Sequence, residues 1–212
     1  RVESAIATGS WIGERSGVTQ NMDKTNYMAV LSQLQRVTSL LPGEQENFLA
    51  RTLHPTHYGR FCPTETPEGT EIGLRKNLAL MARVSTAIDF DESHVMKILN
   101  SFGLTSENNE ESRDVFFNGR FMGFSDNPVE LVEKVRRARR VGEIPWEVSV
   151  RYDEMLTQVS ISSGVGRVLR PLVIAENGAP RIRDEHLVLL QEGKMKWMDL
   201  VKEGIIEYID AA

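Results

Sequence analysis

The residue types that can do chemistry gather in one short stretch of this 212-residue chain. His54 and His57 are three residues apart, a spacing that can serve a metal ion on a helix. A proline lies between them, however, and no third ligand follows at a recognisable spacing. Cys62 together with one of these histidines could form a nucleophilic pair, but nothing nearby resembles an oxyanion loop or an orienting acid. Glu65 and Glu68 have the residue type of a general acid–base pair.

The stretch that carries these residues, 51–74, fits neither a helix period nor a strand period. Its prolines fix φ, and its glycines allow backbone geometry that other residues avoid. A polar loop of this length is usually functional or disordered, and the density of prolines argues for a fixed path. From the residue types alone, a structural crossover loop whose histidines cap backbone groups is as good an interpretation as a functional loop.

The same stretch resembles a known family. Its motifs are Leu53-His-Pro-Thr-His-Tyr-Gly-Arg60, Cys62-Pro63, Glu65-Thr-Pro-Glu-Gly69, Gly73-Leu74 and Lys76-Asn-Leu78, preceded by Thr8-Gly-Ser-Trp-Ile-Gly13 and Asp23-Lys-Thr-Asn-Tyr27. They resemble the fork segment of the second-largest subunit of multisubunit DNA-dependent RNA polymerases, in its archaeal and eukaryotic form. The strong resemblance covers about residues 8–84, and the remainder resembles, more weakly, the external domain that follows the fork.

The resemblance implies a place beside the RNA–DNA hybrid and the downstream strand-separation point. The residues expected to line the active centre or contact nucleic acid are Gln20, Asp23, Arg36, Arg60, Glu68 and Lys76. Gln20 would contact the RNA backbone, Arg36 would brace the fold or face phosphate, and Glu68 would lie near the RNA 3′ region. The fork loop is expected at Pro42, Gly43, Glu44, Gln45 and Glu46. Its two glutamates favour steric separation of the strands over phosphate binding.

The resemblance also implies a division of labour. Phosphoryl transfer needs a divalent metal held by clustered carboxylates, and the chain has no tight aspartate cluster. We therefore expect neither a catalytic residue nor a cofactor here, with Mg²⁺ bound by the largest subunit of the parent enzyme. The expected partners are that subunit, other polymerase subunits, the DNA template and the RNA–DNA hybrid, with no membrane. The expected location is the cytoplasm (the archaeal nucleoid), or the nucleus of a eukaryote.

Composition agrees with an ordinary globular protein, with 41% apolar and 26% charged residues. The single cysteine excludes an internal disulfide. Net charge is −5, which argues against a generic nucleic-acid coat. Of the 25 Lys/Arg and 30 Asp/Glu, residues 1–85 hold 9 and 8, which leaves 16 and 22 for residues 86–212. Any nucleic-acid contact is therefore expected in the first part. The chain begins without methionine, which suggests a piece of a larger polypeptide.

Periodicity and turn signals predict an α+β fold. A loop-rich, irregular fork region is expected over 1–84, followed by a mixed α/β external domain with antiparallel strands over 85–212. The first part is expected to hold a partial helix within 20–37 capped by Asp23 or Thr25, a turn over 40–47 and an apolar strand over 77–88. The second part is expected to hold helices over 91–102, 128–141, 184–191 and 196–202, a hairpin at Asn118-Gly119, strands over 148–152, 158–162, 167–174 and 205–209, and a turn at 177–178.

Four arginines, Arg136, Arg137, Arg139 and Arg140, form a basic cluster at the end of the second of these helices. Such a cluster can touch nucleic acid, but a solvated or protein-facing surface is the favoured interpretation in an acidic domain. A competing hypothesis for the whole chain is an autonomous protein-interaction module without catalytic activity. Its binding surface would be the histidine–proline loop.

Overall fold

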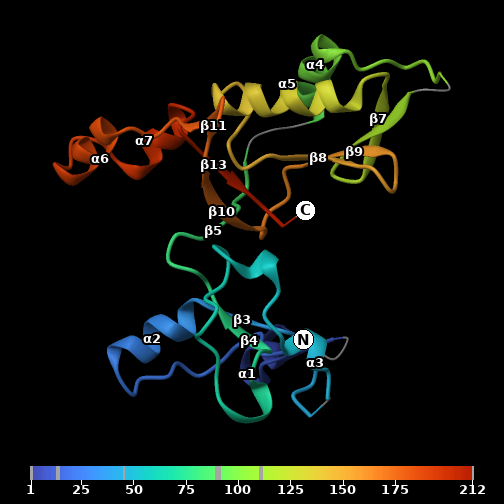
Figure 1. Ribbon diagram of the computed structural model, residues 1–212. Coiled ribbons are helices and arrows are strands. Elements are labelled where there is room, and N and C mark those ends of the chain that lie inside the picture. Colours follow the sequence, from blue (N-terminus) through green and yellow to red (C-terminus); the bar gives the residue numbers. More distant parts are fainter. Residues whose placement is uncertain (1, 13–14, 45, 89–91, 110–111, 212) are drawn as a thin grey trace. The chain divides into compact units, whose positions relative to one another are not determined.

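The computed structural model describes residues 2–12, 15–44, 46–88, 92–109 and 112–211 (Figure 1). The contacts of the chain divide it into two compact units, residues 1–80 and 81–212. The division falls shortly before residue 84, where the sequence places the change from fork to external domain. Each unit has its own sheets and helices, and each is described by itself below.

The first unit is made of short elements joined by long loops. It contains α1 (Val2–Thr8), β1 (Ser10–Trp11), β2 (Arg15–Ser16), α2 (Tyr27–Leu34), β3 (Arg36–Thr38), α3 (Phe48–Arg51), the 3₁₀ turns η1 (Pro55–His57) and η2 (Gly69–Glu71), and β4 (Arg75–Asn77). Among the described residues of this unit, the buried hydrophobic side chains are Ala5 and Leu74. Hydrogen bonds therefore carry most of its structure, in place of a hydrophobic core.

A small antiparallel ladder organises the unit. β3 pairs with β4, with Arg36 opposite Asn77. On the other edge of β4, Phe61 bridges to Leu78, and the Cys62 N–H donates to the Asn77 carbonyl at 2.8 Å. The chain from β4 onward thus lies between β3 and the end of the histidine–proline segment. This pairing gives the 51–74 loop a fixed path.

Two expectations for the first unit are wrong in detail. The cap of α2 is Asn26, whose Oδ1 accepts from the Ala29 N–H at 2.8 Å, in place of Asp23 or Thr25. The apolar strand expected over 77–88 is split into β4 and β5 (Arg83–Val84) by a turn at Leu80, whose side chain is 98% exposed. The apolar run reads as a strand, but its two ends pair with different partners.

The second unit is built first on a four-stranded sheet. The strands are β6 (Arg113–Phe117), β7 (Arg120–Ser125), β8 (Ser149–Asp153) and β9 (Gln158–Ser162), in the order β7-β6-β9-β8. The β6–β9 pair is parallel and the other two pairs are antiparallel. The helix α5 (Pro128–Arg140) packs on this sheet and α4 (Glu92–Phe102) packs on α5 (Figure 1). Valines, leucines and isoleucines from these elements form one core.

A second core lies beneath a three-stranded sheet of the same unit. Its strands, in the order β13-β10-β5, are β13 (Ile206–Ile209), β10 (Val168–Val173) and β5, and they pair antiparallel. Leu169, Leu200 and Ile206 are almost fully buried there, next to α6 (Asp184–Gln191) and α7 (Trp197–Lys202). A short hairpin, β11 (Ala175–Glu176) with β12 (Ala179–Pro180), completes the unit. The predicted α+β class is confirmed.

Turn chemistry is where the sequence prediction is strongest. Asn118 and Gly119 have φ of 49° and 79°, the positive values that a type I′ hairpin turn requires. The β6–β7 hairpin therefore forms where it is predicted. Asn127 caps α5 through its side chain, and Pro128 lies in the first turn of the helix expected over 128–141. Asp91, the first residue of the helix expected over 91–102, lies outside the described residues.

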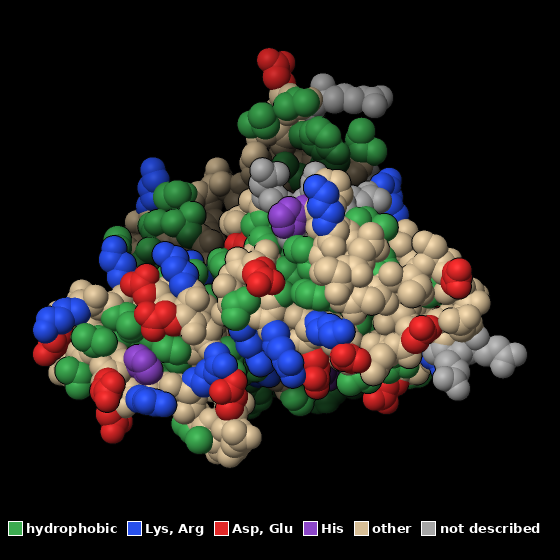
Figure 2. All heavy atoms as spheres, turned by 90° about the horizontal axis from the view of Figure 1, so that it is seen from above, with side chains coloured by type: hydrophobic (Ala, Val, Ile, Leu, Met, Phe, Trp, Pro, Cys, Tyr) green, Lys and Arg blue, Asp and Glu red, His purple; other side chains and the backbone are tan. Residues whose placement is uncertain are grey.

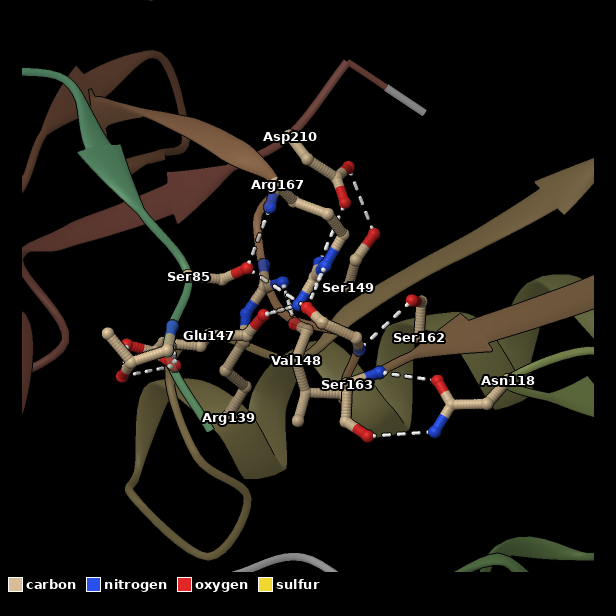
Figure 3. Close-up of polar contacts among 12 residues, drawn as sticks. Ser85, Asn118, Arg139, Glu147, Val148, Ser149, Ser162, Ser163, Arg167 and Asp210 are labelled. Atoms are coloured by element: carbon tan, nitrogen blue, oxygen red, sulfur yellow. Dashed lines mark hydrogen bonds and ion pairs between the residues drawn. The ribbon is translucent and has the colours of Figure 1, made fainter. Parts of the chain in front are cut away.

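A polar network joins the two sheets of the second unit (Figure 3). Arg167 donates from Nη1 to the Asp210 carboxylate at 2.8 Å and from Nη2 to the Glu147 carbonyl at 2.6 Å. Asp210 also accepts from the Ser149 hydroxyl at 3.0 Å. The Arg167 N–H donates to the Ser85 hydroxyl at 3.0 Å. Charge-assisted bonds of this kind hold β5, β8, β10 and β13 together where apolar packing between the two cores is interrupted.

Candidate functional site

Arg51 ties the fork loop to the segment before β4. Its Nη1 donates to the carbonyls of Thr70 and Ile72 at 2.7 and 2.9 Å. Its Nη2 donates to the Gly43 carbonyl at 2.7 Å. Gly73 fits this arrangement because its φ is +74° and an added Cβ would lie 2.3 Å from the Arg51 carbonyl oxygen. Sequence reasoning missed Arg51, because its acceptors are backbone carbonyls that carry no sequence signal.

We call these three hydrogen bonds the Arg51 clamp. They border an open depression of about 490 Å³. It is lined by Gly43, Glu44, Glu46, Asn47, Phe48, Arg51, Gly69, Thr70 and Ile72. The structure therefore brings the predicted fork loop next to η2, which follows Glu68. Gln45 lies outside the described residues, and Pro42 is exposed at the start of the turn. The depression presents two exposed carboxylates, while its arginine is occupied by carbonyls, so it offers no cation to a phosphate group.

The two histidines cap a 3₁₀ turn. The His57 Nδ1 accepts from the His54 N–H at 3.3 Å, and the His54 Nδ1 accepts from the Thr56 N–H at 3.3 Å. The pKa of His57 is lowered by partial burial and by the charges of Lys76 and His54, which keeps the imidazole neutral and able to accept. The His57 ring meets Phe61 edge-on at 5.7 Å between ring centres. The structural interpretation of this histidine pair is therefore the right one.

The carboxylates of the loop do not converge. Glu65 Oε1 accepts from the Ser32 hydroxyl of α2 at 2.8 Å, and Glu71 pairs with Arg75. Glu68 is exposed at the start of η2 and makes no side-chain cap there. Across the residues that the structure describes, no three His, Cys, Asp or Glu side chains gather as metal ligands. Glu65 is thus a bracing residue and does not form an acid–base pair with Glu68.

The one thiol is partly buried beside Thr64. Cys62 Sγ lies 3.4 Å from the Thr64 hydroxyl, and hydrogen bonds from Thr64 lower the pKa of the thiol. The Cys62 N–H is committed to the ladder through Asn77. These contacts give Cys62 a local structural role at the turn into the Glu65–Gly69 segment.

The predicted basic residues do not share one surface. Arg36 and Lys76 are in neighbouring register positions of the β3–β4 ladder, so their side chains leave on opposite faces. Both are half-buried. Arg60 is only 4% exposed, and its Nη1 donates to the Thr56 carbonyl at 2.9 Å. This position makes Arg60 a brace of the histidine turn, and we remove it from the residues expected to contact nucleic acid.

Gln20 and Asp23 lie in the extended segment before α2, and both are exposed. The segment is fastened to α2 by Gln33, whose Oε1 accepts from the Asp23 N–H at 2.6 Å and whose Nε2 donates to the Asn21 carbonyl at 2.9 Å. Hydrogen bonds from Thr25 lower the pKa of Asp23, so its carboxylate is ionised at neutral pH. Figure 1 shows α2 and α3 on opposite sides of the β3–β4 ladder.

Comparison with known proteins matches both units. The family model of RNA polymerase Rpb2, domain 3, matches residues 20–84, and that of RNA polymerase Rpb2, domain 4, matches residues 115–176. The DNA-directed RNA polymerase subunit Rpo2 of Sulfolobus acidocaldarius is 43% identical over all of this chain. The RNA polymerase II subunit RPB2 of Encephalitozoon cuniculi is 35% identical over 97% of it, and the RNA polymerase III subunit RPC2 of Schizosaccharomyces pombe is 33% identical over 97%.

The chain spans about a fifth of the length of these curated relatives, 20% of Rpo2 and 19% of the other two. The two family models match parts of both units, and the matched stretch 20–84 contains the β3–β4 ladder, Arg51 and the histidine turn. The chain belongs to the Rpb2 family of second-largest RNA polymerase subunits, and it corresponds to the part of those subunits that holds domains 3 and 4.

Proposed function

We propose that this chain acts as part of a DNA-directed RNA polymerase, in which it supports RNA synthesis on a DNA template. The observation that carries the proposal is the 43% identity to archaeal Rpo2 over the whole chain. The proposal extends to place: the first unit lines the active-centre cleft near the RNA–DNA hybrid and the strand-separation point. Gln20, Asp23, Arg36, Glu68 and Lys76 are the residues proposed to face nucleic acid or the reacting centre.

The local geometry supports a positioning role. The loops of the first unit are held by the side chains of Arg51, Arg60 and Glu65. The side chains of Gln20, Asp23 and Glu68 are exposed on the backbone that these contacts fix. Gln20 and Glu68 can hydrogen-bond ribose hydroxyls, which are both donors and acceptors. Lys76 has no ion-pair partner among the described residues, so its ammonium group is free to approach phosphate.

The proposal assigns the metal chemistry to another subunit. Template-directed nucleotide transfer uses divalent metal ions to neutralise charge on the reacting phosphates. Glu65 and Glu71 have separate partners, and no three His, Cys, Asp or Glu side chains among the described residues gather as metal ligands. We therefore derive no catalytic step from this chain and assign Mg²⁺ to the largest subunit. The enzyme would work where the genome lies, in the cytoplasm of an archaeon or the nucleus of a eukaryote.

The exposed apolar side chains of the first unit support a multisubunit setting. Leu40, Phe48, Leu49 and Leu80 are 84, 79, 85 and 98% exposed. Large apolar side chains exposed together are typical of protein interfaces. We propose that they are covered in the assembled enzyme by other polymerase subunits, the largest subunit among them. No helix among the described residues is long and apolar enough to cross a membrane.

Site-directed cross-linking in the assembled polymerase tests the placement. A photoreactive amino acid is placed at Gln20 or Glu68, and an elongation complex with labelled RNA and DNA is irradiated. We expect cross-links to RNA or DNA from both positions, because their side chains are exposed on the proposed cleft surface. The matched control is Lys97, an exposed residue of α4 in the second unit. An absence of nucleic-acid products at both test positions, or equal yields at Lys97, would contradict the placement.

The alternative is an autonomous protein-interaction module, and the same exposed apolar side chains support it. The two hypotheses differ in what the native assembly contains. A polymerase subunit co-purifies with a larger subunit and with template-dependent RNA synthesis, whereas a module co-purifies with a partner but without that activity.

A further inference from the structure

A polar pocket of about 270 Å³ opens in the second unit. It lies between the last turns of α5 and the strands β8, β10 and β13. It is lined by Arg136, Arg139, Arg140, Ser149, Val150, Arg151, Leu172, Glu207, Ile209 and Asp210. Three of the arginines share one face of α5, because they are spaced three and four residues apart.

The positive charges of the pocket exceed its negative charges. Glu207 accepts from Arg139 at 2.7 Å and from Arg140 at 2.8 Å, so one carboxylate serves two guanidinium groups. Asp210 is taken by Arg167 at 2.8 Å and by Ser149 (Figure 3).

The two other arginines of the lining have weaker partners or none. Arg151 lies 3.6 Å from Asp153. Arg136 is exposed and has no carboxylate partner among the described residues. With Glu207 and Asp210 both occupied, the lining keeps surplus guanidinium groups.

The surplus positive charge destabilises the protonated form of Arg139, the most buried arginine of the pocket. The side chain of Arg139 is 6% exposed, and its Nε has no hydrogen-bond partner among the described residues. Burial lowers the pKa of Arg139, and the charges of Arg136 and Arg140 lower it further, against the pull of Glu207. Concentrating like charges around a buried cation is unfavourable unless an anion offsets them. The arginines of the pocket therefore outnumber its carboxylates, which favours the binding of an anion.

We propose that this pocket binds a small oxyanion of the phosphate class, held by Arg136 and Arg151, the two lining arginines that Glu207 and Asp210 do not occupy. Guanidinium groups suit such a ligand because their paired N–H donors match two oxygens at once. Arg139 and Arg140 neutralise Glu207, and Arg167 neutralises Asp210, so that these carboxylates repel the ligand less.

The site takes a single anionic group and not a nucleic-acid strand. Residues 86–212 carry 16 basic and 22 acidic residues, which repels an extended polyanion. On the face drawn in Figure 2, basic and acidic side chains are interspersed, with no broad basic track. The basic cluster seen in the sequence is thus divided by the fold, since Arg137 pairs with Glu133 at 3.7 Å on another side of α5.

Calorimetric titration of the full chain with inorganic phosphate, at ionic strength held constant with chloride, tests the proposal. We expect saturable binding at one site per chain. Arg136→Gln should weaken it by about tenfold or more, because a charge-assisted contact is lost. The matched control is Arg137→Gln, which removes the same charge from the neighbouring position outside the pocket. Its affinity should stay within about twofold of the wild type, because a distant surface charge is screened.

Two results would overturn the proposal: phosphate that produces no saturable heat above that of chloride, or an Arg137→Gln variant that is weakened as much as Arg136→Gln. Arg136 is exposed, so its substitution should leave the fold intact, which circular dichroism checks. A second titration with a 5′-phosphorylated dinucleotide identifies the source of the anion. Tighter binding than phosphate, lost again in Arg136→Gln, points to a nucleotide phosphate, and equal binding points to the free ion.

Discussion

Arg51 shows how one side chain can replace a hydrophobic core. The first unit buries little apolar surface, yet three backbone carbonyls from two loops converge on this guanidinium. Each bond to a charged donor contributes more than a neutral one. The fork loop and the η2 segment therefore keep a fixed relation without apolar contact between them.

Replacing Arg51 by alanine should loosen these loops. Losing the guanidinium leaves the carbonyls of Gly43, Thr70 and Ile72 without this donor. We expect local opening to become easier by about 2 kcal/mol, roughly thirtyfold. The measurement is the rate of limited proteolysis within residues 40–75 under conditions where cleavage follows the open population. Lys24→Ala is the control, because Lys24 is an exposed cation of the same unit. Equal rates for the two variants would refute the clamp.

At the same scale, the sequence identified chemical residue types but not their tasks. His54, His57 and Glu65 attract notice as possible ligands or acids, and the structure uses all three to satisfy nearby backbone or side-chain groups. Arg60, which the resemblance would place against nucleic acid, is buried. A residue type fixes what a side chain can do, whereas its partners depend on chain segments that meet only in the fold.

At the scale of elements, two glycines in and after η2 differ in the space available for a side chain. Gly69 and Gly73 both have positive φ, 84° and 74°, but only Gly73 lies against other atoms. Its added Cβ would lie 2.3 Å from the Arg51 carbonyl oxygen, whereas Gly69 has open space. This pair separates the cost of a left-handed backbone from the cost of a clash.

We expect Gly69→Ala to cost about 1 kcal/mol, the penalty of the left-handed conformation. Gly73→Ala should cost about 3 kcal/mol, because backbone atoms must also move apart. Urea unfolding followed by far-ultraviolet circular dichroism measures both. Equal costs for the two variants would mean that the Gly73–Arg51 approach is absent in solution.

Glu207 joins β13 to α5 through Arg139 and Arg140. Partial burial raises the pKa of its carboxyl, but the hydrogen bonds and charges of the two arginines outweigh burial and leave this pKa lowered. A carboxyl with a lowered pKa in the folded state adds stability above its ordinary pKa of about 4.3. That contribution is lost as the pH falls through the folded-state value.

The stability gap between wild type and Glu207→Gln should therefore depend on pH. We expect the wild type to exceed the variant at about pH 6 and the gap to be smaller at about pH 3.5, below the ordinary carboxyl pKa, where the unfolded state binds the proton. Urea unfolding at both values, followed by far-ultraviolet circular dichroism, measures the gap. Glu133→Gln is the control, since that exposed carboxylate pairs only weakly with Arg137. A gap for Glu207→Gln that does not change with pH would contradict the ion-pair account.

The elements of the second unit were largely predictable from the sequence, and those of the first were not. Helix α5 and the β6–β7 hairpin follow from apolar periodicity, a capping residue and an Asn-Gly turn, all of which are local signals. The β3–β4 ladder has three residues a strand and no alternating pattern. Its pairing comes from contacts between distant segments, so the sequence suggested one continuous strand there and missed the turn at Leu80.

For the molecule as a whole, the two units differ in how they are stabilised. The second has two apolar cores, whereas the first has exposed leucines and hydrogen-bonded loops. A unit that exposes leucines and is held by hydrogen bonds, as the first unit is, is completed by the protein surfaces that cover it. This contrast agrees with a chain whose first unit works inside a larger assembly, as the similarity to Rpo2 and RPB2 suggests.

Capture of the native assembly that contains this chain, followed by an RNA synthesis assay, tests whether the chain is part of a working RNA polymerase. The assembly is supplied with nucleoside triphosphates, Mg²⁺ and a DNA template, and its subunits are identified by mass spectrometry. Our account predicts RNA complementary to the template and a co-purifying larger subunit that carries the metal-binding aspartates. An assembly without such a subunit and without template-dependent RNA would contradict it, and would favour the interaction module instead.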